Sequence, residues 1–279
     1  MARIPFRKMH GLGNDFVVLD RRQGGVAIDA AGASALGDRH RGIGFDQLIV
    51  IEKPRDPAAR ALVRFLNSDG SEAGACGNGT RCVASLLAAE DGAREMQLET
   101  VSGLLAAEML ADGRVAVDMG VPRTEWRDIP LAREMDTLHV ELTAGPLADP
   151  VCTNMGNPHA TFFVADAEAV DIEGLGPGLE HDALFPERAN IGVASIAGGG
   201  AIRLRVWERG AGLTLACGSG ACAALVAAAR RGLTGRSAAV IVDGGRLEIA
   251  WREDGHVVMT GPAATSFEGS FDAELLGGL

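Results

Sequence analysis

Short runs rich in apolar and β-branched residues recur along the chain and predict many β-strands. Turn sequences such as Ala111-Asp112-Gly113 and Asp254-Gly255 separate many of these runs. The predicted strands cover residues 61–66, 96–101, 114–119, 138–143, 161–164, 201–207, 247–251 and 256–260. Because so many runs are joined by short turns, we expect mostly antiparallel sheets.

Three segments have the longer apolar pattern of helices. They cover about residues 29–39, 77–90 and 218–231, and the last two are rich in Ala, Leu and Val. Few helices among many strands predict the α+β fold class, with each sheet wrapped around a central helix.

The second and third of these helices follow nearly identical sequences. Residues 75–79 read ACGNG and residues 216–220 read ACGSG, 141 positions apart. Other pairs also repeat: 64–67 with 205–208, Gly13-Asn14 with Gly156-Asn157, and 42–44 with 190–192. The repetition predicts two domains related by a pseudo-twofold axis, with a boundary near residue 120. The domains are then 1–120 and 121–262, and the tail 263–279, with its apolar Phe267 and Phe271, can return to add a strand to the first.

A cysteine at each helix start points to chemistry. The first turn of a helix has backbone N–H groups without partners and about half a positive charge. It can bind a carboxylate, and it can lower the pKa of a thiol from its ordinary value of about 8.5. Cys76 and Cys217 on two faces of one α-carbon could remove a proton from one side and return it from the other, which inverts that carbon.

Other interpretations of the cysteines remain open. Cysteine is often a small buried apolar residue, and this describes Cys82, Cys152 and Cys222 best. A zinc site lacks C-x2-C spacing and a nearby histidine pair, so no metal is expected. A dinucleotide-binding Gly-x-Gly loop would need a parallel βαβ unit, which the predicted antiparallel strands disfavour.

Composition narrows the functional classes. The 26 Lys and Arg residues against 37 Asp and Glu residues give a net charge of −11, which disfavours nucleic acid and anionic membranes as partners. No signal peptide and no apolar stretch of membrane-spanning length is evident. An odd number of cysteines, five, argues against a disulfide framework, so a cytoplasmic location is expected.

Several motifs together resemble diaminopimelate epimerase, over nearly the whole chain. They are residues 9–16 (MHGLGNDF), 39–47 (RHRGIGFDQ), 65–71 (FLNSDGS), 76–79, 155–159 (MGNPH), 186–192 (PERANIG), 207–210 (WERG) and 216–222. The resemblance implies a pyridoxal-independent isomerase that interconverts LL- and meso-2,6-diaminopimelate for lysine and peptidoglycan precursors. It also implies a homodimer and no cofactor.

The same resemblance assigns roles to residues. Cys76 and Cys217 correspond to the catalytic cysteines. The binding site for the reacting carboxylate corresponds to the backbone at Gly77, Asn78, Gly218 and Ser219. The substrate pocket corresponds to the side chains of Asn14, Gln47, Asn67, Asn157, Asn190, Glu208 and Arg209. His159 is a supporting candidate, and a loop or core histidine is at least as good an interpretation.

Two positions depart from the family pattern. Val101-Ser102-Gly103 replaces a Thr-Ala-Asn/Ala-Gly type segment, and Leu213 replaces a glutamate, which removes an acidic group near Cys217. Three alternatives to the epimerase stay open: a proline or hydroxyproline racemase, a dithiol redox switch and an amino-acid-binding protein. The racemase would have no use for the polar pocket around Arg209.

Overall fold

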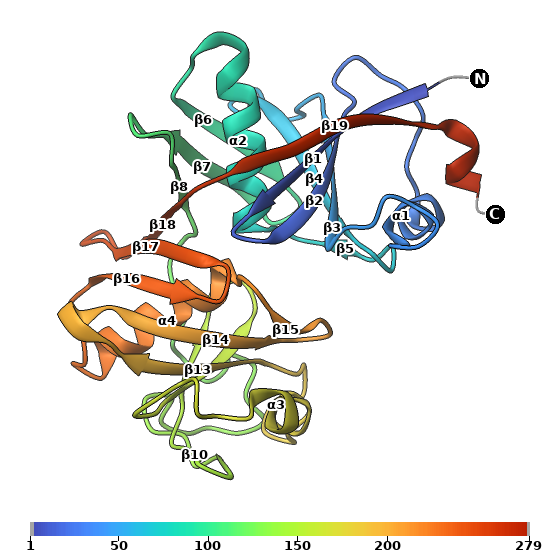
Figure 1. The fold of residues 1–279 in the computed structure, drawn as a ribbon. Coiled ribbons are helices and arrows are strands. Elements are labelled where there is room, and N and C mark those ends of the chain that lie inside the picture. Colours follow the sequence, from blue (N-terminus) through green and yellow to red (C-terminus); the bar gives the residue numbers. More distant parts are fainter. Residues whose placement is uncertain (1–2, 278–279) are drawn as a thin grey trace. The chain divides into compact units, whose positions relative to one another are not determined.

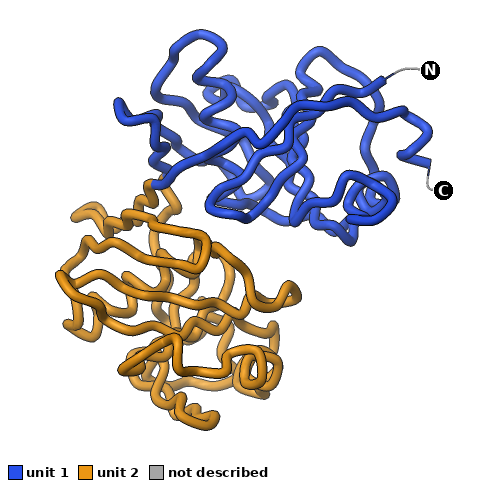
Figure 2. The backbone as a smooth tube through the Cα atoms, in the orientation of Figure 1, with its two compact units in different colours: residues 1–117, 261–279 blue, residues 118–260 orange. Residues whose placement is uncertain are grey.

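The computed structural model describes residues 3–277, and the chain forms two compact units. Unit 1 comprises residues 1–117 and 261–279, and unit 2 comprises residues 118–260 (Figure 2). The chain therefore enters unit 2 once and leaves it once. No helix in residues 3–277 has the length and apolar character needed to span a membrane.

Unit 1 is a mixed sheet with two helices (Figure 1). Strands pair in the order β19-β1-β2-β3-β4-β6-β7-β8, with β5 beside β4. Only β2–β3 and β4–β6 are parallel among these pairs. The elements are β1 (Arg3–Gly11), β2 (Asn14–Asp20), α1 (Ala30–Gly37), β3 (Gln47–Glu52), β4 (Ala61–Asn67), β5 (Glu72–Ala73), α2 (Gly77–Asp91), β6 (Glu95–Thr100), β7 (Gly103–Met109), β8 (Val115–Asp118), β19 (Ala264–Asp272) and the 3-10 helix η2 (Ala273–Gly277).

Unit 2 repeats this plan. Strands pair in the order β11-β12-β13-β14-β16-β17-β18, with β15 beside β14, and β12–β13 and β14–β16 are parallel. A small hairpin of β9 (Thr143–Ala144) and β10 (Leu147–Ala148) is added. The other elements are β11 (Val151–Asn154), β12 (Pro158–Phe163), α3 (Ile172–Glu180), β13 (Asn190–Ile196), the 3-10 helix η1 (Gly198–Gly200), β14 (Ile202–Glu208), β15 (Gly212–Thr214), α4 (Gly218–Arg230), β16 (Ser237–Val242), β17 (Gly245–Trp251) and β18 (Val257–Gly261).

Apart from the β19–β1 pair and the β9–β10 hairpin, the pairings match one for one between the units, strand by strand and in direction. The sequence repeat is therefore a repeat of structure, and the predicted α+β class with mostly antiparallel pairing around a central helix is confirmed. The central helices are α2, which contacts β1, β2 and β7, and α4, which contacts strands β11 to β14, β16 and β17. Both helices are buried along most of their length.

A second helix covers the other face of each sheet. In unit 1, α1 contributes Ala33 and Leu36 to a buried cluster with Leu48 and Val50 of β3. Because both faces of β3 are covered, its residues 48–51 form a continuous buried run instead of alternating. In unit 2, α3 packs in the same way on β13, β14 and β15.

The end of the chain returns to unit 1 as strand β19. Strand β19 pairs antiparallel with β1, from Arg3 opposite Asp272 to His10 opposite Ala264. Just before β19, the carbonyl of Pro262 accepts a hydrogen bond of 3.1 Å from Nε of Arg81, a fully buried side chain of α2. The returning chain is thus tied to the helix that begins at Cys76.

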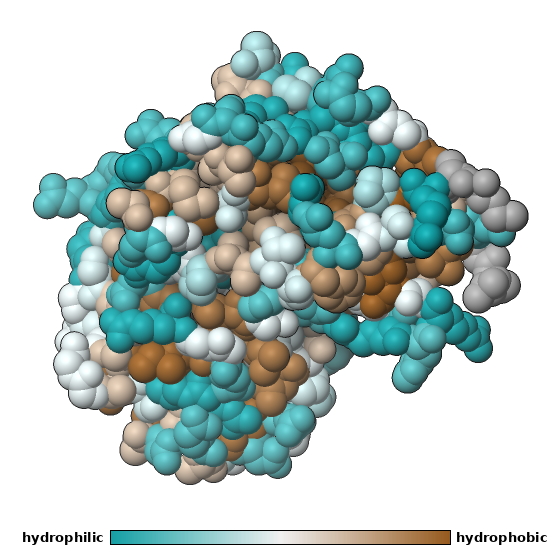
Figure 3. Space-filling view, turned by 45° about the horizontal axis from the view of Figure 1, so that its top comes forward, coloured by the Kyte–Doolittle hydropathy of each residue, from teal (hydrophilic) through white to brown (hydrophobic). Residues whose placement is uncertain are grey.

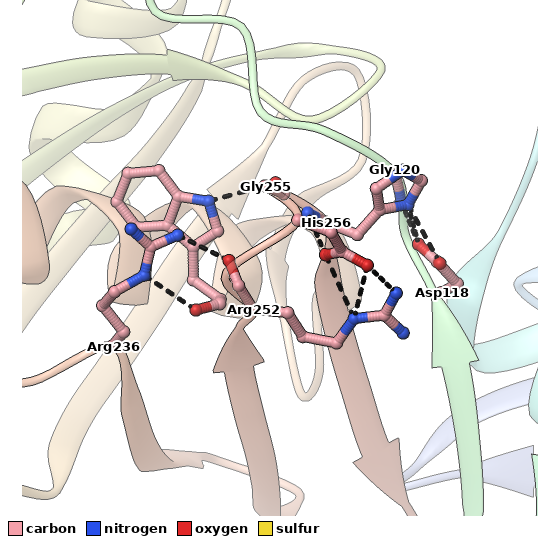
Figure 4. A network of polar contacts seen from close by, with 8 residues as sticks. Asp118, Gly120, Arg236, Arg252, Gly255 and His256 are labelled. Atoms are coloured by element: carbon pink, nitrogen blue, oxygen red, sulfur yellow. Dashed lines mark hydrogen bonds and ion pairs between the residues drawn. The ribbon is translucent and has the colours of Figure 1, made fainter.

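A polar network lies where the chain enters and leaves unit 2 (Figure 4). Nδ1 of His256 lies 2.9 Å from both carboxylate oxygens of Asp118, and the N–H of Val257 donates to the carbonyl of Gly120. These contacts join the entering segment to the start of β18.

One expectation was wrong, and one helix was missed. Residues 138–143 do not form the predicted strand: Val140 and Leu142 are buried in the core of unit 2, but only Thr143 of this segment joins a strand, β9. The alternating apolar residues of this segment point into the core of unit 2, although the backbone there is irregular. Helix α3 was not predicted, because Gly174, Pro177 and Gly178 lie inside it.

Candidate active site

Cys76 is the N-cap of α2, as the position before the helix predicts. Its Sγ accepts a hydrogen bond from the N–H of Gly79 at 3.4 Å, and the Cys76 side chain is partly exposed. A sulfur at this point faces the positive end of the helix dipole, which favours the thiolate.

Cys217 occupies the same position on α4. Its Sγ accepts a hydrogen bond from the N–H of Gly220 at 3.3 Å and lies 3.6 Å from Oγ of Ser219. Here burial raises the pKa of the thiol well above its ordinary value, and the charge of Glu208 raises it further, while Ser219 and the N–H of Gly220 act in the opposite direction. Cys217 therefore holds its proton at neutral pH.

Asn14 and Asn78 meet in unit 1. Nδ2 of Asn78, in the first turn of α2, donates to Oδ1 of Asn14 at 3.1 Å. Nδ2 of Asn14 donates in turn to Oδ2 of Asp46 at 2.8 Å. The carboxylate thus fixes which way the Asn14 amide points. Sequence reasoning gave Asp46 no role, although it stands directly before Gln47.

A charged cluster holds Asp46 in place. Arg39 donates to Oδ1 of Asp46 at 2.9 Å and to Oδ1 of Asp15 at 2.8 Å, and Lys8 also contacts Asp15. Burial alone would raise the pKa of Asp15, but hydrogen bonds from Arg39 and Lys8 lower it to about 2.

Gln47 and Asn67 form a second pair in unit 1. They stand opposite each other in the β3–β4 register, and Nε2 of Gln47 donates to Oδ1 of Asn67 at 2.9 Å. Oε1 of Gln47 is buried and has no hydrogen-bond partner within residues 3–277. That oxygen is an acceptor suited to an ammonium group.

In unit 2, the ring of His159 joins Asn157 and Ser219 in a cluster of polar side chains. Nε2 of His159 lies 2.9 Å from Oδ1 of Asn157 and 3.0 Å from Oγ of Ser219. Burial, aided by the charge of Arg209, lowers the pKa of His159 to about 3, so the ring is neutral. Because the amide oxygen of Asn157 can only accept, Nε2 carries the single proton of the neutral ring and donates it. The hydroxyl of Ser219 is then free to donate its own proton to Sγ of Cys217.

Asn190, Glu208 and Arg209 come together at the adjoining strand ends. Oδ1 of Asn190 accepts from the backbone N–H of Arg209 at 2.9 Å, and its Nδ2 donates to the carbonyl of Pro158 at 2.9 Å. The hydroxyl of Thr214 donates to Oε1 of Glu208. Arg209 is exposed, and Nη1 donates to the carbonyl of Glu187 at 2.8 Å.

The sequence of this chain is similar to those of known proteins. The sequence profile described as "Diaminopimelate epimerase" matches residues 6–125 and 151–266. A diaminopimelate epimerase from Rhodospirillum centenum is 60% identical over 98% of this chain and 94% of its own length. One from Acidiphilium cryptum is also 60% identical, over 99% of both chains. The chain belongs to the diaminopimelate epimerase family.

Solved structures show the wider fold. A hydroxyproline epimerase from Agrobacterium vitis superposes with a TM-score of 0.67 over 99% of this chain and 95% of its own, at 16% identity. This likeness concerns the fold alone. The resemblance drawn from the motifs is confirmed, and the protein is an isomerase of the diaminopimelate epimerase family.

The structure shows what surrounds the two positions that depart from the family pattern, Leu213 and the segment 101–103. Leu213 of β15 stands opposite Trp207 and packs against the core cluster of unit 2, and the carboxylate beside Cys217 comes from Glu208. Ser102 lies in the turn between β6 and β7, where its N–H donates to the carbonyl of Gly74 at 3.2 Å, just ahead of Cys76.

The other three cysteines are fully buried. Burial raises the pKa of Cys82 and of Cys152 to about 12, so both are neutral at physiological pH. They are packing residues, as the sequence favoured. Among residues 3–277, no three His, Cys, Asp or Glu side chains are grouped as metal ligands would be.

Proposed function

We propose that this protein interconverts LL- and meso-2,6-diaminopimelate by two-base proton transfer between Cys76 and Cys217. A thiolate takes the α-proton of the substrate, and the other thiol gives its proton to the opposite face of the same carbon. One S–H bond forms and another breaks, so the enzyme returns with the two roles exchanged. No cofactor is needed. The observation that carries the proposal is the duplicated N-cap thiol of α2 and α4.

The helix starts suit the charge that develops. Loss of the α-proton moves negative charge onto the carboxylate oxygens, and fixed N–H groups bind that charge more strongly in the transition state than in the substrate. We assign this role to the backbone at Gly77 and Asn78 in α2 and at Gly218 and Ser219 in α4.

The environment of Cys217 suggests the resting protonation state. Its thiol is buried and lies beside Glu208, and both raise its pKa. We therefore propose that Cys217 begins as the acid in one direction and that Cys76, partly exposed at its helix start, begins as the base.

The remaining polar residues suit the distal amino acid of the substrate. Arg209 can hold the distal carboxylate with two parallel hydrogen bonds. The amides of Asn14, Gln47, Asn67, Asn157 and Asn190 can accept from the ammonium groups or donate to the carboxylates. A substrate without the distal group would leave these partners unpaired, which favours a double amino acid.

Deuterium incorporation tests the proposal. Reduced enzyme is incubated in D2O with LL-diaminopimelate and no added cofactor. We expect one deuterium at the epimerised α-carbon, none at the other, and conversion to the meso isomer. Arg209→Ala should raise KM strongly. Absence of label from reduced, folded enzyme would refute the proposal.

We further propose that the protein is a cytoplasmic homodimer acting in lysine and peptidoglycan precursor synthesis. Strand β19 offers a surface for the second copy: Phe267 is 52% exposed, with its ring 6.0 Å from that of Phe6. Figure 3 shows hydrophilic and hydrophobic residues interspersed on one face of the molecule. Light scattering of Phe267→Asp should show a monomer; an unchanged mass would argue against this surface.

A further inference from the structure

Glu180 is the last residue of α3 and is nearly inaccessible, at 3% exposed. A carboxylate is rarely buried unless several donors satisfy it. Oε2 accepts from Nε1 of Trp207 at 2.8 Å, and Oε1 accepts from the backbone N–H of Gly210 at 3.0 Å. Nη1 of Arg188 lies 3.4 Å from the same Oε1 and supplies a positive charge.

These two donors lie on either side of Glu208 and Arg209. Trp207 precedes the pair and Gly210 follows it, so the Glu180 carboxylate holds both ends of the segment that carries them. The backbone of Glu180 adds a third contact, since its carbonyl accepts from the N–H of Ala189 at 3.3 Å. Ala189 directly precedes Asn190, which itself holds the N–H of Arg209.

The helix reaches this position because of Gly176. A Cβ at Gly176 would lie 2.5 Å from Cγ of Trp207, so only glycine lets α3 lie against the indole ring. The end of α3 is thereby brought within hydrogen-bond distance of the strand end. The buried carboxylate is built for this one segment.

We propose that Glu180 is a positioning residue of the epimerase, which fixes the segment 207–210 so that Arg209 and Glu208 face the substrate and Cys217. The inference rests on the proposed function for the roles of Glu208 and Arg209. A shift of about 1 Å in a positioned group can cost about a hundredfold in rate.

Glu180→Gln is the direct test. A glutamine has one carbonyl oxygen and one NH2 group, so it can accept from Gly210 or from Trp207 but must set its NH2 against the other donor. We expect KM for diaminopimelate to rise about tenfold or more, because Arg209 is displaced. A loss of folded enzyme alone would lower the apparent kcat and leave KM unchanged. Glu173→Gln, an exposed acid in the first turn of the same helix, is the matched control and should leave both constants unchanged.

A second substitution provides a rescue. Trp207→Phe removes the indole N–H, so in Glu180→Gln/Trp207→Phe the NH2 group faces a ring and the carbonyl accepts from Gly210. We expect the double variant to have a lower KM than Glu180→Gln alone. If Glu180→Gln is insoluble, Trp207→Phe by itself should still raise KM, because it releases one end of the segment.

Hydrogen exchange at the Gly210 amide gives a readout that does not depend on activity. This amide should exchange faster in Glu180→Gln than in the wild type and in Glu173→Gln, and slow again in the double variant. A wild type without epimerase activity would refute the proposed function, while the exchange result would still decide whether Glu180 holds the segment. An unchanged KM together with unchanged Gly210 exchange in folded Glu180→Gln would overturn the inference.

Discussion

Phe16 in unit 1 and His159 in unit 2 have the same place in the repeated fold. Phe16 stands opposite Gln47 in the parallel pair β2–β3, and His159 stands opposite Asn190 in the parallel pair β12–β13. A fully buried phenylalanine packs where the other unit has a buried, neutral imidazole.

The last residues of the corresponding strands β4 and β14 also differ, from neutral in unit 1 to ionisable in unit 2. Asn67 ends β4 and Glu208 ends β14, 141 positions later, so an amide in unit 1 corresponds to a carboxylate in unit 2. The duplicated backbone supplies a thiol at each helix start, whereas the residue at the end of the adjoining strand is a neutral amide in unit 1 and a carboxylate in unit 2. The comparison teaches that repetition places a thiol at each helix start and that local substitution gives the two thiols different polar neighbours.

The largest effect is expected from removing either thiol. Cys76→Ala and Cys217→Ala should each reduce the rate of epimerisation by about 10²- to 10⁴-fold, the usual contribution of a general acid or base. The measurement is kcat/KM with LL- and with meso-diaminopimelate, with circular dichroism to confirm folding. Cys152→Ala is the control at a buried packing thiol, where stability falls and catalysis by the folded fraction persists. A near-normal rate in either N-cap variant would contradict two-base transfer.

His159→Phe makes unit 2 resemble unit 1. The change leaves Ser219 and Asn157 without the imidazole, and an unsatisfied buried polar group costs about 1–3 kcal/mol. We expect kcat/KM to fall by about 5- to 150-fold if that cost is borne in the transition state. Equal activity in His159→Phe and the wild type would mean that the histidine is only a core residue.

The same histidine predicts a pH dependence of stability. Its pKa is about 3 in the folded chain, below the ordinary value of 6.5, so the unfolded chain binds the proton first as pH falls. The free energy of unfolding should be unaffected by His159 above pH 6.5 and should fall between pH 6.5 and about 3, by up to about 1.4 kcal/mol per pH unit. Denaturant titrations should show a shallower acid limb for His159→Phe, and an identical slope would show that the imidazole is not buried neutral.

The sequence predicted the helix starts well because their signals are local. Helices predicted at 77–90 and 218–231 are Gly77–Asp91 and Gly218–Arg230, each fixed by an N-cap and an apolar run. Helix α3 could not be predicted, since glycine at position 176 is required only by the contact with Trp207, a residue about thirty positions away. Asp46 and Glu180 could not be assigned from the sequence either, because their hydrogen-bond partners Asn14 and Gly210 lie 32 and 30 positions away along the chain.

Glu208→Asn tests the charge difference between the units. Removing the carboxylate removes a cause that raises the pKa of Cys217, so that pKa should fall. In a Cys76→Ala background, the alkylation rate of Cys217 should rise at a lower pH than with Glu208 present. Glu248→Gln, a partly exposed acid of β17 in the same unit, should leave the profile in place. A profile unmoved by Glu208→Asn would assign the raised pKa to burial alone.

The smallest effect concerns the glycine three residues after each thiol. A Cβ at Gly79 would lie 2.6 Å from Cε1 of Phe65, whereas one at Gly220 would lie 3.1 Å from both Sγ of Cys217 and Cγ2 of Val206. Gly79→Ala should therefore lower stability by about 1–3 kcal/mol through overpacking. Gly220→Ala should press on the sulfur itself and alter the alkylation of Cys217 more than it alters stability.

Gly178→Ala is the control for both changes. It lies in α3 with no atom within 4 Å of an added Cβ, so alanine should raise stability by about 0.5–1 kcal/mol through helix propensity. Thermal unfolding and the alkylation rate of Cys217 separate the two effects. If Gly79→Ala and Gly220→Ala lowered stability equally and left Cys217 equally reactive, the two helix starts would be equivalent, and the asymmetry between the thiols would have to come from the strands alone.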